Sequence, residues 1–549
     1  MTEILIILQI VLMFLLIVYM GSNSRNAHSK KVVIQKENEK EMTKLANMRR
    51  VKLTEPLTEK SRPTTFEEII GQEEGLNALR AALCGPNPQH VIIYGPPGVG
   101  KTAAARIVLK EAKKKRKSPF NQGAKFVEID ATTLRFDERG IADPLIGSVH
   151  DPIYQGAGSL GIAGIPQPKA GAVTKAHGGV LFIDEIGELH SIMLNKLLKV
   201  LEDRKVFLDS SYYSSEDPNM PDYIKEIFDN GLPADFRLIG ATTRGPEDIA
   251  PAIRTRCVEV FFRALNPDEI KLIARNACKK IGLNINEDAL NMVSRYCNNG
   301  RDVVNIVQLA SGFAINDEKE EISLDNVNWV IENGQYMEIM DKKIKDKPMI
   351  GVVNGLAVQG ANIGMLMEIE ASANKATNGK GKLKITGIIE EEEISTSNRK
   401  IKRKSTAYSS VQNVLTVLDS LYKLNCDAYN IHVNIPGGVP VDGPSAGITI
   451  ALALYSAIKG IPINNKIAMT GEISLMGAVK PIGGVGAKIL AAKKAGAEKV
   501  IIPQDNWKDS FSNIDAIEVI PVRFFSEVLD TAFSSEGDSD IDVLSAQSI

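Results

Sequence analysis

The chain has 549 residues, of which 44% are hydrophobic and 24% charged, and its formal net charge is −2. This length exceeds what one hydrophobic core supports and predicts about two to four domains, while the near-neutral charge argues against nucleic acid as the main partner. The five cysteines contain no CxxC pair, which is typical of a reduced compartment without disulfides or a zinc site.

The first stretch of the chain, residues 4–20, is apolar except for Gln9 and Tyr19. At about 1.5 Å per residue it spans roughly 25 Å, enough for a thin bilayer. A signal peptide would begin with basic residues, whereas here they come after the stretch, at Arg25, Lys30 and Lys31. We therefore expect a transmembrane helix at 1–21, rather than a signal peptide or a buried helix. The expected protein spans the cell membrane once and keeps its other domains in the cytoplasm.

The rest of the chain divides by pattern into several parts. Four apolar runs that alternate with helical patterns predict a parallel sheet covered on both faces; they are residues 91–94, 126–129, 180–183 and 237–240. A helical region without strands follows, then a mixture of strands and helices, and finally an acidic, serine-rich end that is typical of disorder. The predicted fold class is multidomain α/β, with a linker at 22–60, a parallel α/β domain at 61–265, a small helical domain at 266–345, an α+β domain at 346–533 and a disordered tail at 534–549.

A phosphate-binding loop follows the first of the apolar runs. It matches the pattern GxxxxGK[ST] between a strand and a helix, with the residues Gly95, Pro96, Pro97, Gly98, Val99, Gly100, Lys101 and Thr102. Backbone N–H groups of such a loop hold phosphate oxygens, while Lys101 would reach the β and γ phosphates and Thr102 would offer a hydroxyl to Mg²⁺. Asp184 and Glu185 end another run, where Asp184 can hold Mg²⁺ and Glu185 can polarise the attacking water. The predicted ligands are ATP and Mg²⁺.

With these motifs the sequence resembles the AAA+ ATPases, and shorter segments extend the resemblance. Residues 70–72 resemble the segment beside the adenine. Residues 240–244 resemble sensor 1, with Thr242 or Thr243 in place of the commoner asparagine. Both assignments place further residues around the nucleotide.

The arginine positions of that family also have matches. Residues 253–257 resemble the arginine-finger region, in which Arg256 matches best and Arg254 is the rival, and Arg301 matches sensor 2. An arginine finger acts on the nucleotide of a neighbouring subunit, so the resemblance implies a homo-oligomeric ring, usually a hexamer.

A glycine-rich segment, residues 156–166, lies between the two nucleotide motifs. AAA+ motors have a mobile loop there that grips substrate in the pore of the ring. By that resemblance Ile162 and Ile165 would be the apolar grips, and Tyr154 is a further candidate.

Ser445 follows a Gly-Pro turn and precedes an apolar helical run. The local sequence favours a helix cap over a nucleophile. As a nucleophile it would need a base, and N–H groups at the helix start could hold an oxyanion. A lysine can be that base if an apolar pocket lowers its pKa. Lys488 opens an apolar helix and is slightly favoured over the other candidates, which are Lys480, Lys493 and Lys494.

Residues 442–447, 470–472 and 481–488 resemble the Lon protease domain, and the resemblance to Lon proteases covers about residues 60–530, in the short bacterial form of the LonB type. It implies that Ser445 is the nucleophile and Lys488 the general base. It also implies supporting roles for four residues, His432, Asp442, Thr470 and Glu472. The sequence departs from many relatives at Asn430, where they have a second histidine, and in a slightly longer loop before Ser445.

The resemblance thus implies an ATP-dependent serine endopeptidase of the endopeptidase La type, which unfolds and degrades unfolded or misfolded proteins and does not require nucleic acid. Two alternatives remain. One is an AAA+ motor that acts on nucleic acid, and the other is a membrane-tethered remodelling chaperone with an inactive peptidase fold.

Overall fold

The computed structural model describes residues 13, 38, 40–50, 53–134, 143–150, 165–210, 213–217, 220–339, 343–345, 347–359, 363–377, 379–387, 391–396, 399–404, 406–435 and 443–533. The chain forms two compact units, residues 1–60 and residues 61–549. In the first unit, residues 40–50 are helical and exposed, and α2 (Leu57–Lys60) buries Leu57.

The expected membrane anchor at 1–21 lies, except for Met13, outside the described residues. Within the described part of the chain, no helix is both long enough and apolar enough to cross a bilayer. The helical residues 40–50 are exposed and carry several charges, including Lys40, Lys44 and Arg50, which a bilayer core would exclude. With no such helix among the described residues, the predicted single-pass localisation in the cell membrane is contradicted, whereas the segment 1–21 itself is not described apart from Met13.

The second unit begins with a five-stranded sheet in the order β2-β5-β8-β1-β9, in which all neighbours are parallel. Its strands are β1 (His90–Tyr94), β2 (Phe126–Asp130), β5 (Val180–Asp184), β8 (Arg237–Thr242) and β9 (Cys257–Phe261). The last four residues of β1 are fully buried, as expected for a central parallel strand. The four predicted strands are confirmed, and β9 is an additional edge strand.

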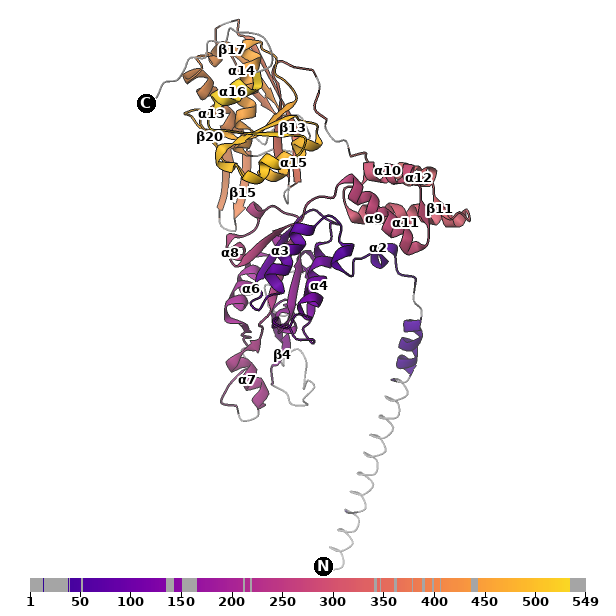
Figure 1. Cartoon of the computed structure of the whole chain (residues 1–549). Coiled ribbons are helices and arrows are strands. Elements are labelled where there is room, and N and C mark those ends of the chain that lie inside the picture. The colour runs from indigo at the N-terminus through magenta and orange to yellow at the C-terminus, as the bar shows by residue number, and fades with distance from the viewer. Residues whose placement is uncertain are drawn as a thin grey trace, which may run out of the picture. The chain divides into compact units, whose positions relative to one another are not determined.

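Helices pack on this sheet, and their connections carry small additional elements (Figure 1). The main helices are α3 (Glu73–Leu83), α4 (Lys101–Ala112) and α6 (Ser191–Asp203). The smaller elements are the hairpin β3 (Gly147–His150) and β4 (Gln167–Ala170), the pair β6 (Lys205–Val206) and β7 (Leu232–Pro233), and the helices α5 (Ala172–Lys175), α7 (Asp222–Asn230) and α8 (Pro251–Arg254).

Four helices follow, α9 (Pro267–Ile281), α10 (Glu287–Tyr296), α11 (Gly300–Asn316) and α12 (Leu324–Asn333). The start of α9 is fixed by its sequence, because Asn266 and Glu269 form a reciprocal capping box around Pro267. Gly282 ends the helix in the left-handed conformation. The region was expected to contain no strands, and this detail is wrong, since β10 (Asn284–Ile285) and β11 (Glu321–Ile322) form a short parallel pair.

The carboxy-terminal domain is built on a seven-stranded sheet in the order β14-β17-β13-β12-β18-β21-β22. Its strands are β12 (Val352–Gln359), β13 (Ile363–Lys375), β14 (Leu383–Thr386), β17 (Tyr429–Asn434), β18 (Ile467–Met469), β21 (Lys499–Pro503) and β22 (Glu518–Val522). Two short antiparallel pairs stand beside this sheet, namely β15 (Glu391–Thr396) with β16 (Arg399–Lys404), and β19 (Glu472–Ile473) with β20 (Val479–Lys480).

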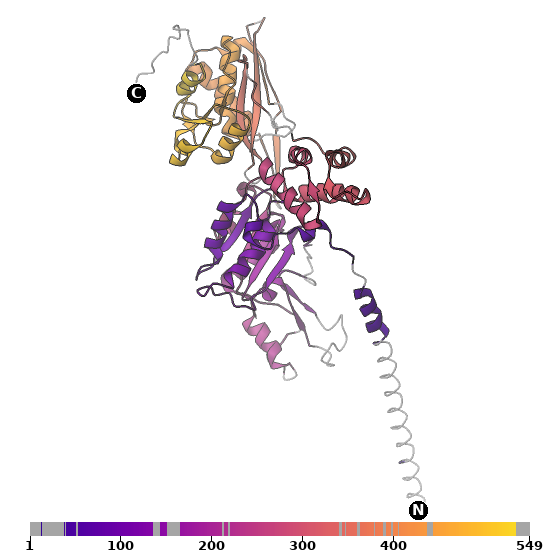
Figure 2. The ribbon, with the colours of Figure 1, turned by 45° about the vertical axis from the view of Figure 1, so that its right-hand side comes forward.

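Side chains that alternate along these strands fill two hydrophobic cores, one on each face of the sheet. In β13, for example, Leu366 belongs to one core and Met367 to the other. The helices α13 (Thr406–Ser420), α14 (Gly447–Lys459) and α16 (Phe525–Phe533) contribute to the core with Met367, whereas α15 (Val485–Lys494) contributes to the core with Leu366. Figure 2 shows the helices of this domain, in orange to yellow, packed beside its strands. Ser445 and Lys488 are therefore carried by elements of opposite faces.

Candidate active site

The phosphate loop connects the end of β1 to the start of α4, as the motif predicts. Gly98 and Gly100 have positive φ angles of 70° and 98°, which other residues adopt rarely. Lys101 is 7% exposed, and its Nζ donates hydrogen bonds to Gly95 O at 2.6 Å and Pro96 O at 2.8 Å. Burial lowers the pKa of this amine, although Glu185 and Asp184 oppose the change. Two carbonyl oxygens of the loop thus hold the Lys101 amine in place.

The two carboxylates at the end of β5 face this loop. Thr102 Oγ1 lies 3.4 Å from Asp184 Oδ2, so a hydroxyl and a carboxylate, both ligand types that suit Mg²⁺, are side by side. Burial raises the pKa of Asp184. Glu185 has a φ of 48°, a strained conformation for a residue with a side chain and one that is common at functional sites.

Of the two candidates for sensor 1, one touches Glu185. The N–H and the hydroxyl of Thr243 both donate to Glu185 Oε2, each at 3.1 Å. Thr242 is fully buried, and its Oγ1 instead accepts the N–H of Arg244 at 3.0 Å. The two side chains point in opposite directions because they are neighbours at the end of a strand.

The first turn of α11 lies against the phosphate loop. Gly300 N donates to Gly98 O at 3.0 Å, and a Cβ atom at Gly98 would lie 2.8 Å from Asn299 Oδ1. The charge of Arg301 contributes to lowering the pKa of Lys101. The structure therefore brings the predicted sensor 2 residue into the electrostatic environment of the loop lysine.

The two arginine-finger candidates differ in their partners. Arg254 Nε donates to Glu259 Oε1 at 2.7 Å, and the same oxygen accepts Tyr94 Oη at 3.0 Å. Arg256 donates to Ala252 O at 2.7 Å and forms an ion pair with Glu202, a more exposed residue of α6. Arg254 is thus tied to the sheet by a shared carboxylate. No local pattern indicates Glu259, whose role depends on the pairing of β9 with β1.

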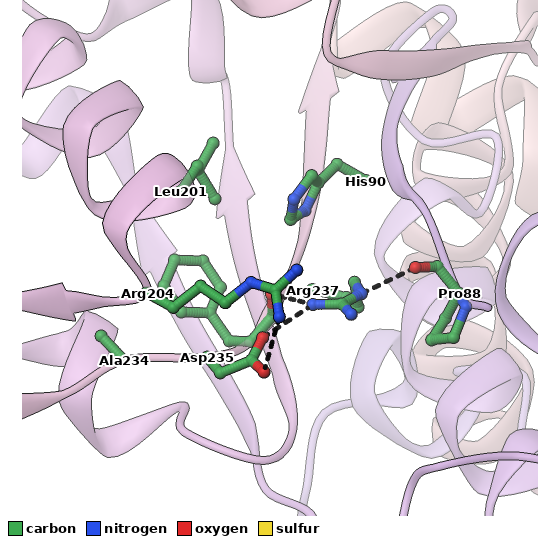
Figure 3. A pocket seen from close by; sticks show the side chains of 8 residues that line it. Pro88, His90, Leu201, Arg204, Ala234, Asp235 and Arg237 are labelled. Atoms are coloured by element: carbon green, nitrogen blue, oxygen red, sulfur yellow. Dashed lines mark hydrogen bonds and ion pairs between the residues drawn. The ribbon is translucent and has the colours of Figure 1, made fainter.

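One cavity, of about 210 Å³, lies at the amino-terminal ends of the strands of the first sheet (Figure 3). It is lined by His90 and Arg237, the first residues of β1 and β8, whereas the phosphate loop follows the last residue of β1. Arg237 is paired with Asp235 at 2.9 Å and with Pro88 O at 2.7 Å. Burial lowers the pKa of His90 to about 4, so its neutral Nδ1 can accept the Leu238 N–H at 3.0 Å. These contacts engage His90 and Arg237 with the main chain and with Asp235, away from the phosphate loop.

Ser445 sits in a 3₁₀ turn, Pro444–Ala446, directly before α14. Its carbonyl oxygen accepts the N–H of Gly471 at 2.9 Å and the hydroxyl of Thr470 at 3.2 Å. Gly447 allows the helix to approach β19, since a Cβ atom there would lie 2.7 Å from Ile473 N. The turn is therefore fixed to the segment that follows β18.

The expected oxyanion donors at this helix start are partly engaged. Gly447 N donates to Pro444 O, and Ile448 N donates to Gly471 O at 3.1 Å. The Gly447 N–H is thus engaged within the 3₁₀ turn and the Ile448 N–H by the segment after β18, so in this conformation neither of the two offers itself to an oxyanion, and the role of the helix start stays a prediction.

Lys488 lies in the second turn of α15 and is 3% exposed. Its Nζ donates to Thr470 Oγ1 at 3.1 Å. Burial lowers the pKa of this amine to about 8, and among the described residues no acidic side chain forms an ion pair with it. Thr470 thus links the lysine to the main chain of Ser445. Within the described hydrogen bonds, none joins Ser445 Oγ to Lys488 Nζ directly.

The remaining predicted site residues are placed as follows. His432 Nε2 lies 3.0 Å from Thr386 Oγ1, and no described hydrogen bond joins the ring to Ser445 or Lys488. Glu472 pairs in register with Lys480 in the short β19–β20 ladder. Asp442 lies outside the described residues. Thr470 is therefore the one supporting residue that the described contacts connect to both members of the predicted dyad.

The predicted pore residues are described only in part. Ile162 and Tyr154 lie outside the described residues. Ile165 is 6% exposed and belongs to the hydrophobic core of the first sheet. An apolar grip must meet substrate, so the buried side chain of Ile165 contradicts that role in this conformation.

Comparison with known proteins agrees with both halves of this arrangement. Residues 91–265 match the model of the ATPase family associated with various cellular activities (AAA), and residues 326–535 match the Lon protease (S16) C-terminal proteolytic domain. The chain is 60% identical over 512 residues to Lon protease 2 of Bacillus subtilis (strain 168), which covers 93% of this chain and 92% of that one. It is 31% identical over 471 residues to the archaeal Lon protease of Thermococcus kodakarensis (78% of this chain and 68% of that one). The chain therefore belongs to the Lon protease family, and it is an ATP-dependent protease with an AAA ATPase domain and a Lon proteolytic domain in one polypeptide.

Proposed function

We propose that this protease cleaves peptide bonds with a dyad of Ser445 and Lys488. The observation that carries the proposal is the buried Lys488 amine, which is held by Thr470 beside the turn of Ser445. Desolvation favours the neutral amine, and a neutral amine can accept a proton near neutral pH. The dyad requires Lys488 Nζ to exchange its bond to Thr470 for one to Ser445 Oγ, and hydrogen bonds of catalytic groups often tighten only with substrate bound.

The reaction then proceeds in two steps through an acyl-enzyme. Ser445 Oγ attacks the peptide carbonyl as its proton passes to Lys488 Nζ, which gives a tetrahedral intermediate. The C–N bond breaks when the Lys488 ammonium returns the proton to the leaving amine, and an ester between Ser445 and the substrate remains. Water then attacks the ester, with Lys488 again as the base, and releases the carboxylic acid product and Ser445.

The dependence of cleavage on pH tests this assignment. Because the base must be neutral, and the pKa of Lys488 is lowered to about 8, kcat/KM for a short peptide should fall about tenfold per pH unit below about pH 8 and level off above it. The measurement is a pH profile of peptide cleavage. Lys488→Arg, which keeps the charge, should be inactive across the whole range. A profile whose acid limb lies near about 6.5, typical of an imidazole base, would point away from Lys488.

We propose further that the ATPase domain hydrolyses MgATP with Glu185 as the group that polarises water and Thr243 as the sensor 1 residue. Thr102 and Asp184 supply the oxygen ligands for Mg²⁺, and Arg301 approaches the loop from α11. The proposal for Thr243 rests on its two hydrogen bonds to Glu185 Oε2, which hold the carboxylate in place.

Thr243→Val should lower kcat for ATP hydrolysis about 10–100-fold, because it removes a hydrogen bond to a charged group worth about 1.5–3 kcal/mol. Binding of a fluorescent ATP analogue should be retained. Thr242→Val is the matched control. It removes the acceptor of the Arg244 N–H in a buried place, so it should lower the unfolding temperature more than kcat. The opposite pattern, with kcat lost in Thr242→Val and kept in Thr243→Val, would reverse the assignment.

We also propose a homo-oligomeric ring, with Arg256 as the arginine finger that reaches the nucleotide of the neighbouring subunit. Arg256 is supported over Arg254 by their partners, since Arg254 shares Glu259 of the edge strand β9 with Tyr94, whereas Arg256 pairs with the more exposed Glu202. Substrates of the ring are unfolded or misfolded proteins. The similarity to archaeal Lon proteases over most of the chain supports the LonB type.

A further inference from the structure

The approach of α15 to the sheet determines where Lys488 stands. Three apolar residues of this helix, Val485, Ile489 and Ala492, are buried in one core with Leu356 and Leu366 of β12 and β13. Lys488 is buried on the same side of the helix. Its burial and its distance to Thr470 therefore depend on how closely α15 packs on β12 and β13.

A single glycine of β13 occupies the point of closest approach. A Cβ atom at Gly364 would lie 2.0 Å from Ala487 O and 3.1 Å from Ala491 Cβ. The first contact is with the main chain of the residue directly before Lys488, so no side-chain rotation could relieve it. Gly364 does not have a positive φ, and the backbone conformation alone would accept alanine. Glycine is needed here for the contact.

We propose that Gly364 is a positioning residue for catalysis: the absence of a side chain at this point lets α15 hold Lys488 buried and bonded to Thr470. The inference rests on the proposed dyad of Ser445 and Lys488. A methyl group at Gly364 must push α15 outward at Ala487. Lys488 Nζ would then move away from Thr470 and gain water, although it lies on a different element from the substituted residue.

The readout that separates positioning from general stability is the acid limb of the peptide-cleavage profile. Desolvation is the cause of the lowered pKa of Lys488, whose ordinary value is 10.5. Hydration of the amine raises its pKa again, so less of the neutral base is present at a given pH. A merely destabilised enzyme would lose activity without moving this limb.

The experiment uses the full chain and compares two variants, Gly364→Ala and Ala491→Val. They add methyl groups to the same helix–strand contact, the first from β13 and the second from α15. Each should lower kcat/KM for a short peptide about 10–100-fold at pH 8, shift the acid limb to higher pH and recover activity in more alkaline buffer. ATP hydrolysis should stay within about twofold. Leu490→Ala is the control, because Leu490 lies on the same helix but is 53% exposed.

An acid limb at the wild-type pH in both variants would overturn the proposal, whether or not the rate falls. If Gly364→Ala does not fold, Ala491→Val decides by the same criterion, since its added methyl groups lie on α15 and not in the sheet. Ser445→Ala keeps the two proposals apart. Cleavage retained in Ser445→Ala would defeat the dyad itself, whereas an inactive Ser445→Ala together with an unshifted limb in the packing variants would defeat only the role of Gly364.

Discussion

Ser445→Ala is expected to abolish degradation of an unfolded protein such as casein, with a rate lowered on the order of 10⁴-fold or more, the scale of losing a nucleophile. The hydroxyl is the atom that forms the ester, and no other group of the turn Pro444–Ala446 can replace it. ATP hydrolysis should continue, because the phosphate loop and the carboxylates of β5 belong to another domain. The measurement is release of acid-soluble peptides, run beside release of phosphate from ATP in the same samples.

Ser512→Ala is a matched control for this experiment. Ser512 is an exposed serine of the same domain, and its hydroxyl only donates to Asp509 O, so the variant should degrade casein at the wild-type rate. A fluorophosphonate probe should label the wild-type chain and not Ser445→Ala. Casein cleavage at an equal rate in Ser445→Ala would refute the nucleophile. Intact ATPase activity without cleavage by the wild-type chain would favour a remodelling chaperone.

Much of the first sheet could be predicted from the sequence because its buried strands are short, continuous apolar runs. Runs such as 91–94 are apolar at every position, which only a strand buried on both faces requires, and the loop motif that follows fixes the direction of the chain. The strand Cys257–Phe261 was missed because Glu259 interrupts its apolar pattern. That carboxylate is tolerated at the sheet edge since Arg254 and Tyr94 bind it.

In the site, the sequence could indicate Lys488 from the apolar helix around it, and its burial agrees. Other features depend on contacts that no local pattern reveals. The choice of Thr243 over Thr242 follows from which side of a strand end faces Glu185. The engagement of the Ile448 N–H at the start of α14 follows from the approach of Gly471, which comes more than twenty residues later in the chain. Tertiary packing decided each of these points.

Lys101→Ala is expected to reduce ATP turnover to background and to stop degradation of folded proteins, while short peptides are still cleaved. The lysine is the one charged group of the loop, and the variant leaves the phosphates without the amine that Gly95 O and Pro96 O now orient. Cleavage of a short peptide needs no unfolding, and the Ser445 turn with its Thr470 and Lys488 contacts lies in the other domain. The three activities are measured in parallel on one preparation.

Two further variants make the result specific. Lys110→Ala removes an exposed lysine from the last turn of the same helix α4, and it should leave all three activities unchanged. Glu185→Gln should bind ATP but not hydrolyse it, because it keeps the loop lysine and loses the carboxylate that polarises water. Turnover that survives in Lys101→Ala would refute the assignment of the loop. If Lys101→Ala and Glu185→Gln both lose degradation of folded proteins, hydrolysis and not binding alone drives unfolding, since only the second variant still holds nucleotide.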